Sequence, residues 1–323
     1  MLEKLRGEHP VIESILEHRQ LSKLKGTYVD ALPALVNPNT GRVHTSFNQT
    51  GSVTGRFSSS NPNLQNIPIR TELGRKVRRA FVADDGWVLM AVDYSQVELR
   101  VLAHISRDPA MLAAFARGED IHASTAAAIY DVPLEEVTRE QRQVAKMTNF
   151  AISYGVTGYG LAERTELTIP EADAFIETSF ERYPRIKEYI DGTREQARER
   201  GYVETLLGRR RYFPELGTRA RVHRNVRDTA YRMAINAPIQ GTAADILKVA
   251  MNRLWRELQS QGLRSRMILQ VHDELVLEVP EKELEPVARL VKTTMEGAYK
   301  LDAALVADTK VGRNWLDMNE YQT

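Results

Sequence analysis

The feature that most constrains this fold is residues 88–100, VLMAVDYSQVELR. The stretch begins as an apolar run typical of a buried strand, and the run breaks at Asp93. A helix signal follows directly, because Ser95 and Glu98 have the spacing of a capping box. A carboxylate between a buried strand and a helix start is held rigidly yet stays open to solvent. Asp93 is therefore either a site residue or simply the residue that ends the strand.

Composition excludes several classes of protein. The chain has 323 residues, 42% of them hydrophobic and 27% charged, which suits a globular protein of two or three domains or subdomains. No apolar run approaches the roughly 20 residues that span a bilayer, and we expect no secretory segment. With no cysteine, disulfides and thiolate metal sites are excluded, which fits a reducing compartment.

Charge limits how the chain can bind nucleic acid. The formal net charge is +1, so binding would require basic side chains gathered on one surface. Residues 37–70 read as turns and short strands with donors for phosphates and minor-groove acceptors at Arg56, Gln65, Asn66 and Arg70. Residues 219–232 form a second basic stretch. A surface loop and a solvated helix face are the structural alternatives.

The remaining pattern predicts helices, two hairpins and a last strand. One hairpin, residues 202–213, turns at Gly208. The other joins the apolar runs 267–271 and 275–279 through an acidic tip, His272-Asp273-Glu274. A last strand is expected around residues 305–311. Helices are expected to start at residues 108–109 and to cover residues 120–129, 138–154, 170–180, 184–200, 241–258 and 283–299.

The predicted helix 138–154 carries a distinctive stripe. Arg142, Lys146, Phe150 and Tyr154 recur every four residues, so they lie on one gently spiralling face. Two cations followed by two aromatic rings make a poor core face but suit a nucleotide triphosphate, sugar and base. A surface cation pair beside ordinary core aromatics is the alternative.

Asp93, at the end of one apolar run, and the acidic tip of the second hairpin together suggest a metal site. Carboxylates that separate strands bring to one edge can hold a pair of Mg²⁺ ions, which take substrate phosphates as further ligands. Two such ions roughly 3.5–4 Å apart clamp the attacking and leaving oxygens of a phosphoryl transfer. Together with the triphosphate stripe and the loop at 37–70, these tips indicate extension of a primer by a nucleotide.

These motifs resemble family A DNA polymerases, the bacterial DNA polymerase I type. Residues 93–100, the spacing Arg142-x-x-x-Lys146-x-x-Asn149-Phe150-x-x-x-Tyr154-Gly155, and residues 272–274 look like the three polymerase motifs of that family. The resemblance runs in order from about residue 10 to the C-terminus. Further matching segments are residues 54–59, 63–68, 120–122, 208–212 and 238–245.

The resemblance implies an α+β, right-hand fold with an antiparallel palm sheet and helical fingers. Residues 1–26 would be a remnant of thumb helices. Residues 27–109 would form the first part of the palm, with a template and primer loop and the first catalytic aspartate. Fingers would cover residues 110–236, and residues 237–323 would complete the palm with the acidic hairpin.

The resemblance also implies roles for individual residues. The catalytic residues would be Asp93, Asp273 and Glu274. The metal ligands would be Asp93, the backbone carbonyl of Tyr94, and Asp273. The nucleotide-binding residues would be Gln96, Glu98, His122, Arg142, Lys146, Phe150 and Tyr154. The DNA-binding residues would be Arg56, Asn66, Arg70, Arg211, Asn236, Gln240 and His272.

Two nucleotide-binding residues have more specific expectations. Glu98 would crowd the place of a ribose 2′-OH, a role compatible with its capping box. Phe150, where the family also uses Tyr, would disfavour dideoxynucleotides.

The implied function is template-directed DNA synthesis, the addition of deoxynucleoside triphosphates to a primer 3′-OH with two Mg²⁺ ions, Mn²⁺ being a substitute. Implied partners are primer–template DNA and the nucleotide, with no membrane. The resemblance implies a monomer, and a separate chain is one way to supply a thumb. It also implies a cytoplasmic, nucleoid-associated bacterial protein that acts in replication and repair.

Three departures from the family stand out. Most of the thumb and both exonuclease domains are missing, so we expect a polymerase-domain fragment with a weak grip on duplex and no proofreading. Ala151 stands where the family commonly has Gly, which favours the helix by up to about 1 kcal/mol.

Two other functions are open to the same residues. A two-metal nuclease would also use paired aspartates, although it has no need of a triphosphate stripe. A catalytically weak primer–template binding fragment would keep the DNA contacts alone.

Overall fold

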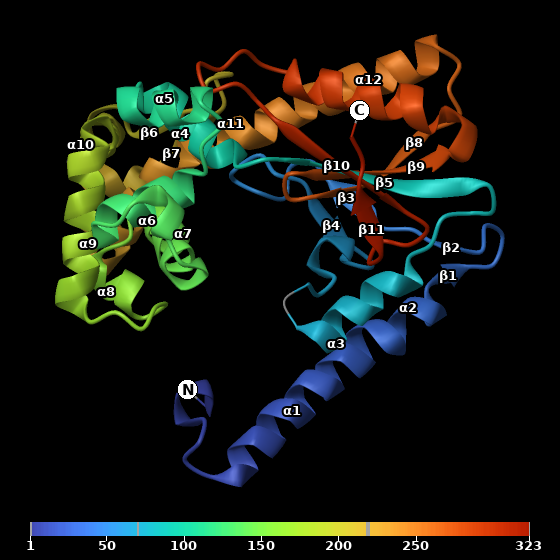
Figure 1. Cartoon of the computed structure of the whole chain (residues 1–323), viewed down its shortest axis with the longest axis horizontal. Helices are drawn as coiled ribbons and strands as arrows, with labels where there is room; N and C mark the ends of the chain where they lie inside the picture. Colours follow the sequence, from blue (N-terminus) through green and yellow to red (C-terminus); the bar gives the residue numbers. More distant parts are fainter. Residues whose placement is uncertain (1, 70, 218–219, 323) are drawn as a thin grey trace.

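The structure, a computed structural model, describes residues 2–69, 71–217 and 220–322 (Figure 1). Arg70 and the start of the second basic stretch, residues 218–219, lie outside the described residues. A mixed sheet and helix architecture confirms the expected α+β class. In Figure 1 a group of helices, α5 to α10, lies on one side of the molecule and the largest sheet on the other.

The largest sheet is antiparallel and centred on β5. Strand β5 covers Trp87–Tyr94, and it pairs with β9 on one side and β10 on the other. The acidic hairpin and the last predicted strand are both confirmed, and β11 is a short additional edge strand. The order across the sheet is β11 (Met318–Glu320), β10 (Ala307–Gly312), β5, β9 (Glu274–Pro280) and β8 (Arg266–Val271).

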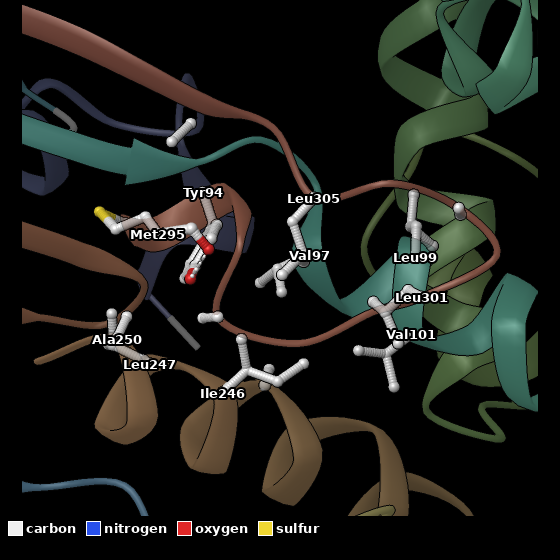
Figure 2. Packing of buried hydrophobic residues seen from close by; sticks show 14 of the residues in the cluster. Tyr94, Val97, Leu99, Val101, Ile246, Leu247, Ala250, Met295, Leu301 and Leu305 are labelled. Atoms are coloured by element: carbon white, nitrogen blue, oxygen red, sulfur yellow. Dashed lines mark hydrogen bonds between the residues drawn. The ribbon is translucent and has the colours of Figure 1, made fainter. Parts of the chain in front are cut away.

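Strand alternation gives the two faces of β5 different tasks. Met90, Val92 and Tyr94 are buried on one face, in the main core with helices α11 (Arg224–Ser260) and α12 (Leu284–Glu296). Figure 2 shows this packing around Tyr94 and Ile246. Leu89 and Asp93 point to the opposite face, where Leu89 joins a smaller cluster and Asp93 is exposed. One strand therefore anchors the core and presents a carboxylate.

The buried hydroxyl of Tyr94 offers a test of this core. Its oxygen donates a 2.6 Å hydrogen bond to the carbonyl of Met295 on α12. Tyr94→Phe should lower the free energy of unfolding in urea by about 1–2 kcal/mol, because the Met295 carbonyl loses its side-chain partner. Tyr299→Phe is the control, since no hydrogen bond of that hydroxyl occurs among the described residues. Equal losses for both variants would contradict the prediction.

The helical side of the molecule is confirmed with small shifts of boundaries. Thr138 caps α7, and Gln141 completes the predicted capping box. After α7, Gly155 adopts φ +61°, and a Cβ there would lie 2.9 Å from Cδ1 of Ile235. The helices are α5 (Pro109–Ala116), α6 (Ile121–Tyr130), α7 (Arg139–Ser153), α8 (Gly158–Ala162), α9 (Ile169–Arg182) and α10 (Pro184–Arg200).

Helix α11 is much longer than predicted. The expected helix covered residues 241–258, whereas α11 starts at Arg224 and has 37 residues with Pro238 inside it. Its first half is stabilised by Ala230, Ala234 and Ala237, which pack in one cluster with the hairpin of β6 (Tyr202–Glu204) and β7 (Arg210–Tyr212). Tertiary packing of small residues, which carry a weak hydrophobic signal, therefore extends the helix past a proline.

Part of the N-terminal region covers the face of the sheet opposite α11 and α12, where Tyr28 and Leu64 pack in one cluster with Leu89 and Val276. Helix α1 (Pro10–Leu24) extends away from the rest of the molecule in Figure 1. The turns and short strands expected in residues 37–70 are confirmed over residues 37–69. None of the helices in the described part of the chain is long and apolar enough to cross a membrane. The short elements are α2 (Ala31–Ala34), α3 (Glu72–Arg75), and the ribbons β1 (Val36–Asn37) with β2 (Arg42–Val43) and β3 (Ser46–Asn48) with β4 (Ser58–Ser60).

Candidate active site

The two predicted aspartates lie together at one end of the sheet. Asp93 is paired across the sheet with Glu274, the first residue of β9. Asp273 immediately precedes Glu274 in the turn, and its carbonyl accepts a 3.2 Å hydrogen bond from the backbone N–H of Tyr94. His272 begins this turn with φ +53°, a left-handed conformation. The register of β5 and β9 thus joins the two acidic tips.

These carboxylates repel one another. Partial enclosure by the protein, then the charges of Glu274 and Asp273, raise the pKa of Asp93 to about 7, although its side chain keeps contact with solvent. Burial also raises the pKa of Glu274, whose Oε1 accepts a 3.1 Å hydrogen bond from Nε1 of Trp315. Glu274 is therefore held by a tryptophan, while Asp93 carries the unfavourable charge.

The donor set suits Mg²⁺. Among the described residues no group of three or more acidic or histidine side chains forms a full cage for a metal ion. Two carboxylates and a backbone carbonyl are nevertheless what Mg²⁺ usually takes from a protein, since water and phosphate oxygens complete its shell. A bound cation would favour the ionised form of Asp93 and remove the repulsion. The residues present therefore fit the expected pair of Mg²⁺ ions.

Helix α4 (Val97–Ser106) begins differently from the prediction. The expected capping box of Ser95 and Glu98 is wrong, because Gln96 is the N-cap, with φ +53° and no side-chain hydrogen bond to the backbone. The N–H of Ser95 instead donates to the carbonyl of Val306 at 2.8 Å, which continues the sheet by one residue. This delay leaves the carboxylate of Glu98 available for other contacts.

Glu98 links the sheet to helix α7. One carboxylate oxygen lies 2.7 Å from Nη2 of Arg56, and the other accepts a 2.9 Å hydrogen bond from the hydroxyl of Tyr154. Arg56 also reaches Oδ1 of Asp273 at 3.3 Å, and Gln240 on α11 donates to the Tyr154 hydroxyl at 3.1 Å. Glu98 is only 7% exposed, and burial raises its pKa although Arg56 opposes the shift. The network joins five segments distant in the sequence.

The side chains of the stripe on α7 are held by an ion pair at one end and by ring stacking at the other. Arg142 pairs with Asp120 through a 2.6 Å contact, and Asp120 also caps α6 by accepting from the N–H groups of His122 and Ala123. Further along the stripe, the rings of Phe150 and Tyr154 are stacked with centroids 6.4 Å apart. Lys146 lies between the two pairs and is half-buried. The cations therefore lie at one end of the stripe and the rings at the other.

His122 is a buried neutral group in this cluster. It is 3% exposed, and its ring lies 5.9 Å from that of Phe150. Burial, reinforced by the charges of Arg142 and Lys146 against that of Asp120, lowers the pKa of His122 to about 4. The imidazole is therefore uncharged at neutral pH.

This depressed pKa predicts a pH dependence of stability. Histidine in the unfolded chain has a pKa near 6.5. Between about pH 6.5 and 4 the imidazole is therefore protonated in the unfolded state but remains neutral in the folded state. Stability should fall as the pH drops through this window, by up to about 3 kcal/mol at the acid end. Urea unfolding of His122→Gln should show a correspondingly flatter pH profile than the parent chain, and identical profiles would contradict the assignment.

The predicted DNA-binding residues are only partly gathered. Asn66 is exposed, and its carbonyl accepts from Tyr28. His272 is exposed beside Asp273, whereas Arg211 on β7 lies over the ring of Phe213. Asn236 on α11 has a buried Oδ1 with no hydrogen-bond partner among the described residues. Arg56 and Gln240 belong instead to the Glu98 network. Gln96 is half-buried at the start of α4.

Comparison with known proteins places this geometry in a family. The model of DNA polymerase family A matches residues 1–317. The chain belongs to DNA polymerase family A. It is 51% identical over 320 residues to the thermostable DNA polymerase I of Thermus aquaticus, and 53% identical over 320 residues to DNA polymerase I of Chloroflexus aurantiacus. These alignments cover 99% of this chain but only 38% and 34% of those relatives.

A solved family A structure has the same fold. The POL domain of Pol1 from M. smegmatis, in complex with DNA primer–template and dNTP, superimposes with a TM-score of 0.93 at 46% sequence identity. The match covers 98% of this chain and 56% of that one. The right-hand polymerase fold expected from the sequence is therefore confirmed.

Three residues of this family A chain were not assigned a role from the sequence. Asp120 orients Arg142, and its position just before a helix start was a usable signal for a cap. Asn149 contacts His122, and its place one residue before Phe150 on the stripe helix hinted at a site role. Trp315 donates a hydrogen bond to Glu274, which lies 41 residues away in the sequence, and no local sequence pattern predicts that contact.

Proposed function

We propose that this chain catalyses template-directed DNA synthesis, adding deoxynucleoside triphosphates to a primer 3′-OH. One observation carries the proposal: hydrogen bonds through Glu98 connect the aspartate pair to the aromatic end of the triphosphate stripe. Asp273 contacts Arg56, Arg56 contacts Glu98, and Glu98 contacts Tyr154. A phosphoryl-transfer centre and a nucleotide face thereby lie in one site.

Each residue then has a defined task. Asp93, Asp273 and the carbonyl of Tyr94 would hold two Mg²⁺ ions, or Mn²⁺ in their place, which supply charge neutralisation for the in-line displacement. Arg142, Lys146 and His122 would bind the triphosphate. Phe150 and Tyr154 would flank the sugar and base. Glu274 would remain beside the aspartates, held by Trp315.

The partners we propose are primer–template DNA and the incoming nucleotide. Exposed Asn66 and His272, together with Arg56, Arg211, Asn236 and Gln240, would contact the duplex. We further propose a monomer, with thumb function reduced or supplied by a second chain, in the nucleoid of a bacterial cytoplasm.

A division into subdomains completes the proposal. Residues 1–26 would belong to a thumb, 27–109 and 237–323 to the palm, and 110–236 to the fingers. The strands of the largest sheet, which come only from the two palm segments, support this division. Helix α11 crosses the boundary between residues 236 and 237 without a break.

Single-nucleotide extension tests the function. The chain, at a concentration above that of a labelled primer–template, should add the one complementary deoxynucleotide in the presence of Mg²⁺. A non-complementary nucleotide is the control. Duplex binding without extension would leave only the binding-fragment alternative, and primer shortening without added nucleotide would support the nuclease.

A further inference from the structure

A buried polar cluster lies between α6 and α7, behind the proposed triphosphate site. His122 and Thr125 come from α6, and Asn149 comes from α7; their exposed fractions are 3%, 1% and 6%. Nδ2 of Asn149 lies 3.2 Å from Nδ1 of His122 and 3.0 Å from the hydroxyl oxygen of Thr125. Buried groups of this kind must satisfy one another, so their hydrogens can be assigned from the contacts.

The assignment starts at Thr125. Its hydroxyl oxygen lies 2.8 Å from the carbonyl oxygen of Ile121 and 3.2 Å from Oδ1 of Asn149. The single hydroxyl hydrogen follows the shorter contact, so the oxygen presents a lone pair to Nδ2 of Asn149 at 3.0 Å. The Asn149 amide nitrogen then donates one hydrogen to Thr125 and directs its second hydrogen to Nδ1 of His122. An imidazole nitrogen that accepts a hydrogen bond has no proton. In neutral His122 the proton is therefore on Nε2.

Nε2 is left for a ligand. No hydrogen bond to it occurs within the described part of the chain, and it is not among the fully enclosed unpaired atoms there. The charged groups around the ring are Asp120 on its own helix start, and Arg142 and Lys146 on α7. A neutral N–H donor beside two cations complements a phosphate oxygen without adding a third positive charge.

We propose that Asn149 is a positioning residue, which fixes His122 as the Nε2–H tautomer so that it donates to a phosphate oxygen of the incoming nucleotide. The phosphate step rests on the proposed function, whereas the tautomer does not. Thr125 acts one step further back, since it orients the Asn149 amide. The pair thereby supplies an uncharged donor at a set position beside Arg142 and Lys146.

Nitrogen NMR of the full chain tests the tautomer directly. With ¹⁵N-labelled histidine, and His122→Gln to assign the signals, His122 at pH 8 should show a protonated Nε2 and an unprotonated Nδ1. A protonated Nδ1 with a bare Nε2 would overturn the proposal. The measurement needs no nucleotide, so it stands even if the chain does not extend a primer.

Asn149→Asp should invert the arrangement, because a carboxylate accepts a hydrogen bond and therefore favours the tautomer with a proton on Nδ1. NMR should then show Nδ1 protonated, and the KM for the nucleotide at pH 8.5 should rise about tenfold, the loss of one hydrogen bond to a charged group. At lower pH His122 gains a second proton, Nε2 donates again, and the KM should recover relative to the parent. If the KM changes neither with the tautomer nor with pH, the phosphate role of His122 is overturned, while the proposal of DNA synthesis still stands.

Two isosteric variants complete the test. Thr125→Val should free the Asn149 amide and raise the KM by about threefold, a partial loss of one hydrogen bond. Thr148→Val is the matched control, because among the described residues that buried hydroxyl on α7 bonds only to the carbonyl of Val144. It should leave both the His122 signals and the KM unchanged. Equal effects of the two threonine variants would show that packing alone is at work and would overturn the proposal.

Discussion

Asp93→Asn is expected to lower nucleotide incorporation by at least about 10³-fold while leaving duplex binding largely intact. Asn keeps the size of the side chain but removes the negative charge that would hold the metal ions, whose charge stabilisation amounts to several kcal/mol. Single-turnover extension with Mg²⁺ measures the loss, and fluorescence anisotropy of a labelled duplex measures binding. Retained synthesis would show that the metal assignment is wrong.

The structure supplies a matched control and an internal check. Asp308 lies opposite Asp93 on β10 and is exposed on the same face, so Asp308→Asn removes a nearby charge without touching the proposed ligands. We expect less than about a threefold change for that variant, as for a screened surface charge. Asp93→Asn should also be at least as stable as the parent at pH 8, because the folded chain disfavours the Asp93 charge.

Glu98→Ala is expected to raise incorporation of ribonucleotides relative to deoxynucleotides by roughly 10²-fold. The carboxylate is held in place by Arg56 and Tyr154, and a rigid group that meets the 2′-OH excludes it more strongly than a mobile one. Competing extension with matched ribo- and deoxynucleotides gives the ratio of the two kcat/KM values.

The control separates volume from charge. Glu98→Gln keeps the size of the side chain and an acceptor for the Tyr154 hydroxyl, but it weakens the pair with Arg56. We expect this variant to retain most of the sugar discrimination. If both variants leave the sugar preference unchanged, Glu98 would serve only the network between α4 and α7.

Local patterns predicted much of the fold and the elements of the site. Apolar runs located β5 and the acidic hairpin, and the resemblance to family A polymerases implied that Asp93 and Asp273 share one palm sheet. The four-residue spacing on α7 located the triphosphate stripe, and Thr138 marked where that helix starts. These signals are readable because each depends on residues within a few positions of one another.

Contacts between distant segments were not predictable in the same way. The capping box at Ser95 failed because Val306, more than 200 residues later, pairs with its N–H. The contacts of Arg56 with Glu98 and Asp273 were not expected from the sequence, because they depend on which charges the fold gathers. The early part of α11 was missed because small alanines stabilise it only through their tertiary neighbours.

The length of α11 also restricts how such a chain can evolve. At 1.5 Å per residue its 37 residues form a rod of about 55 Å, with one end seated against β6 and β7 and the other beneath the main sheet. Inserting or deleting one residue midway would rotate one end by about 100° relative to the other. The apolar face at one end would then no longer meet its packing partners. Length changes here would be tolerated only near whole turns, while surface loops remain free to vary.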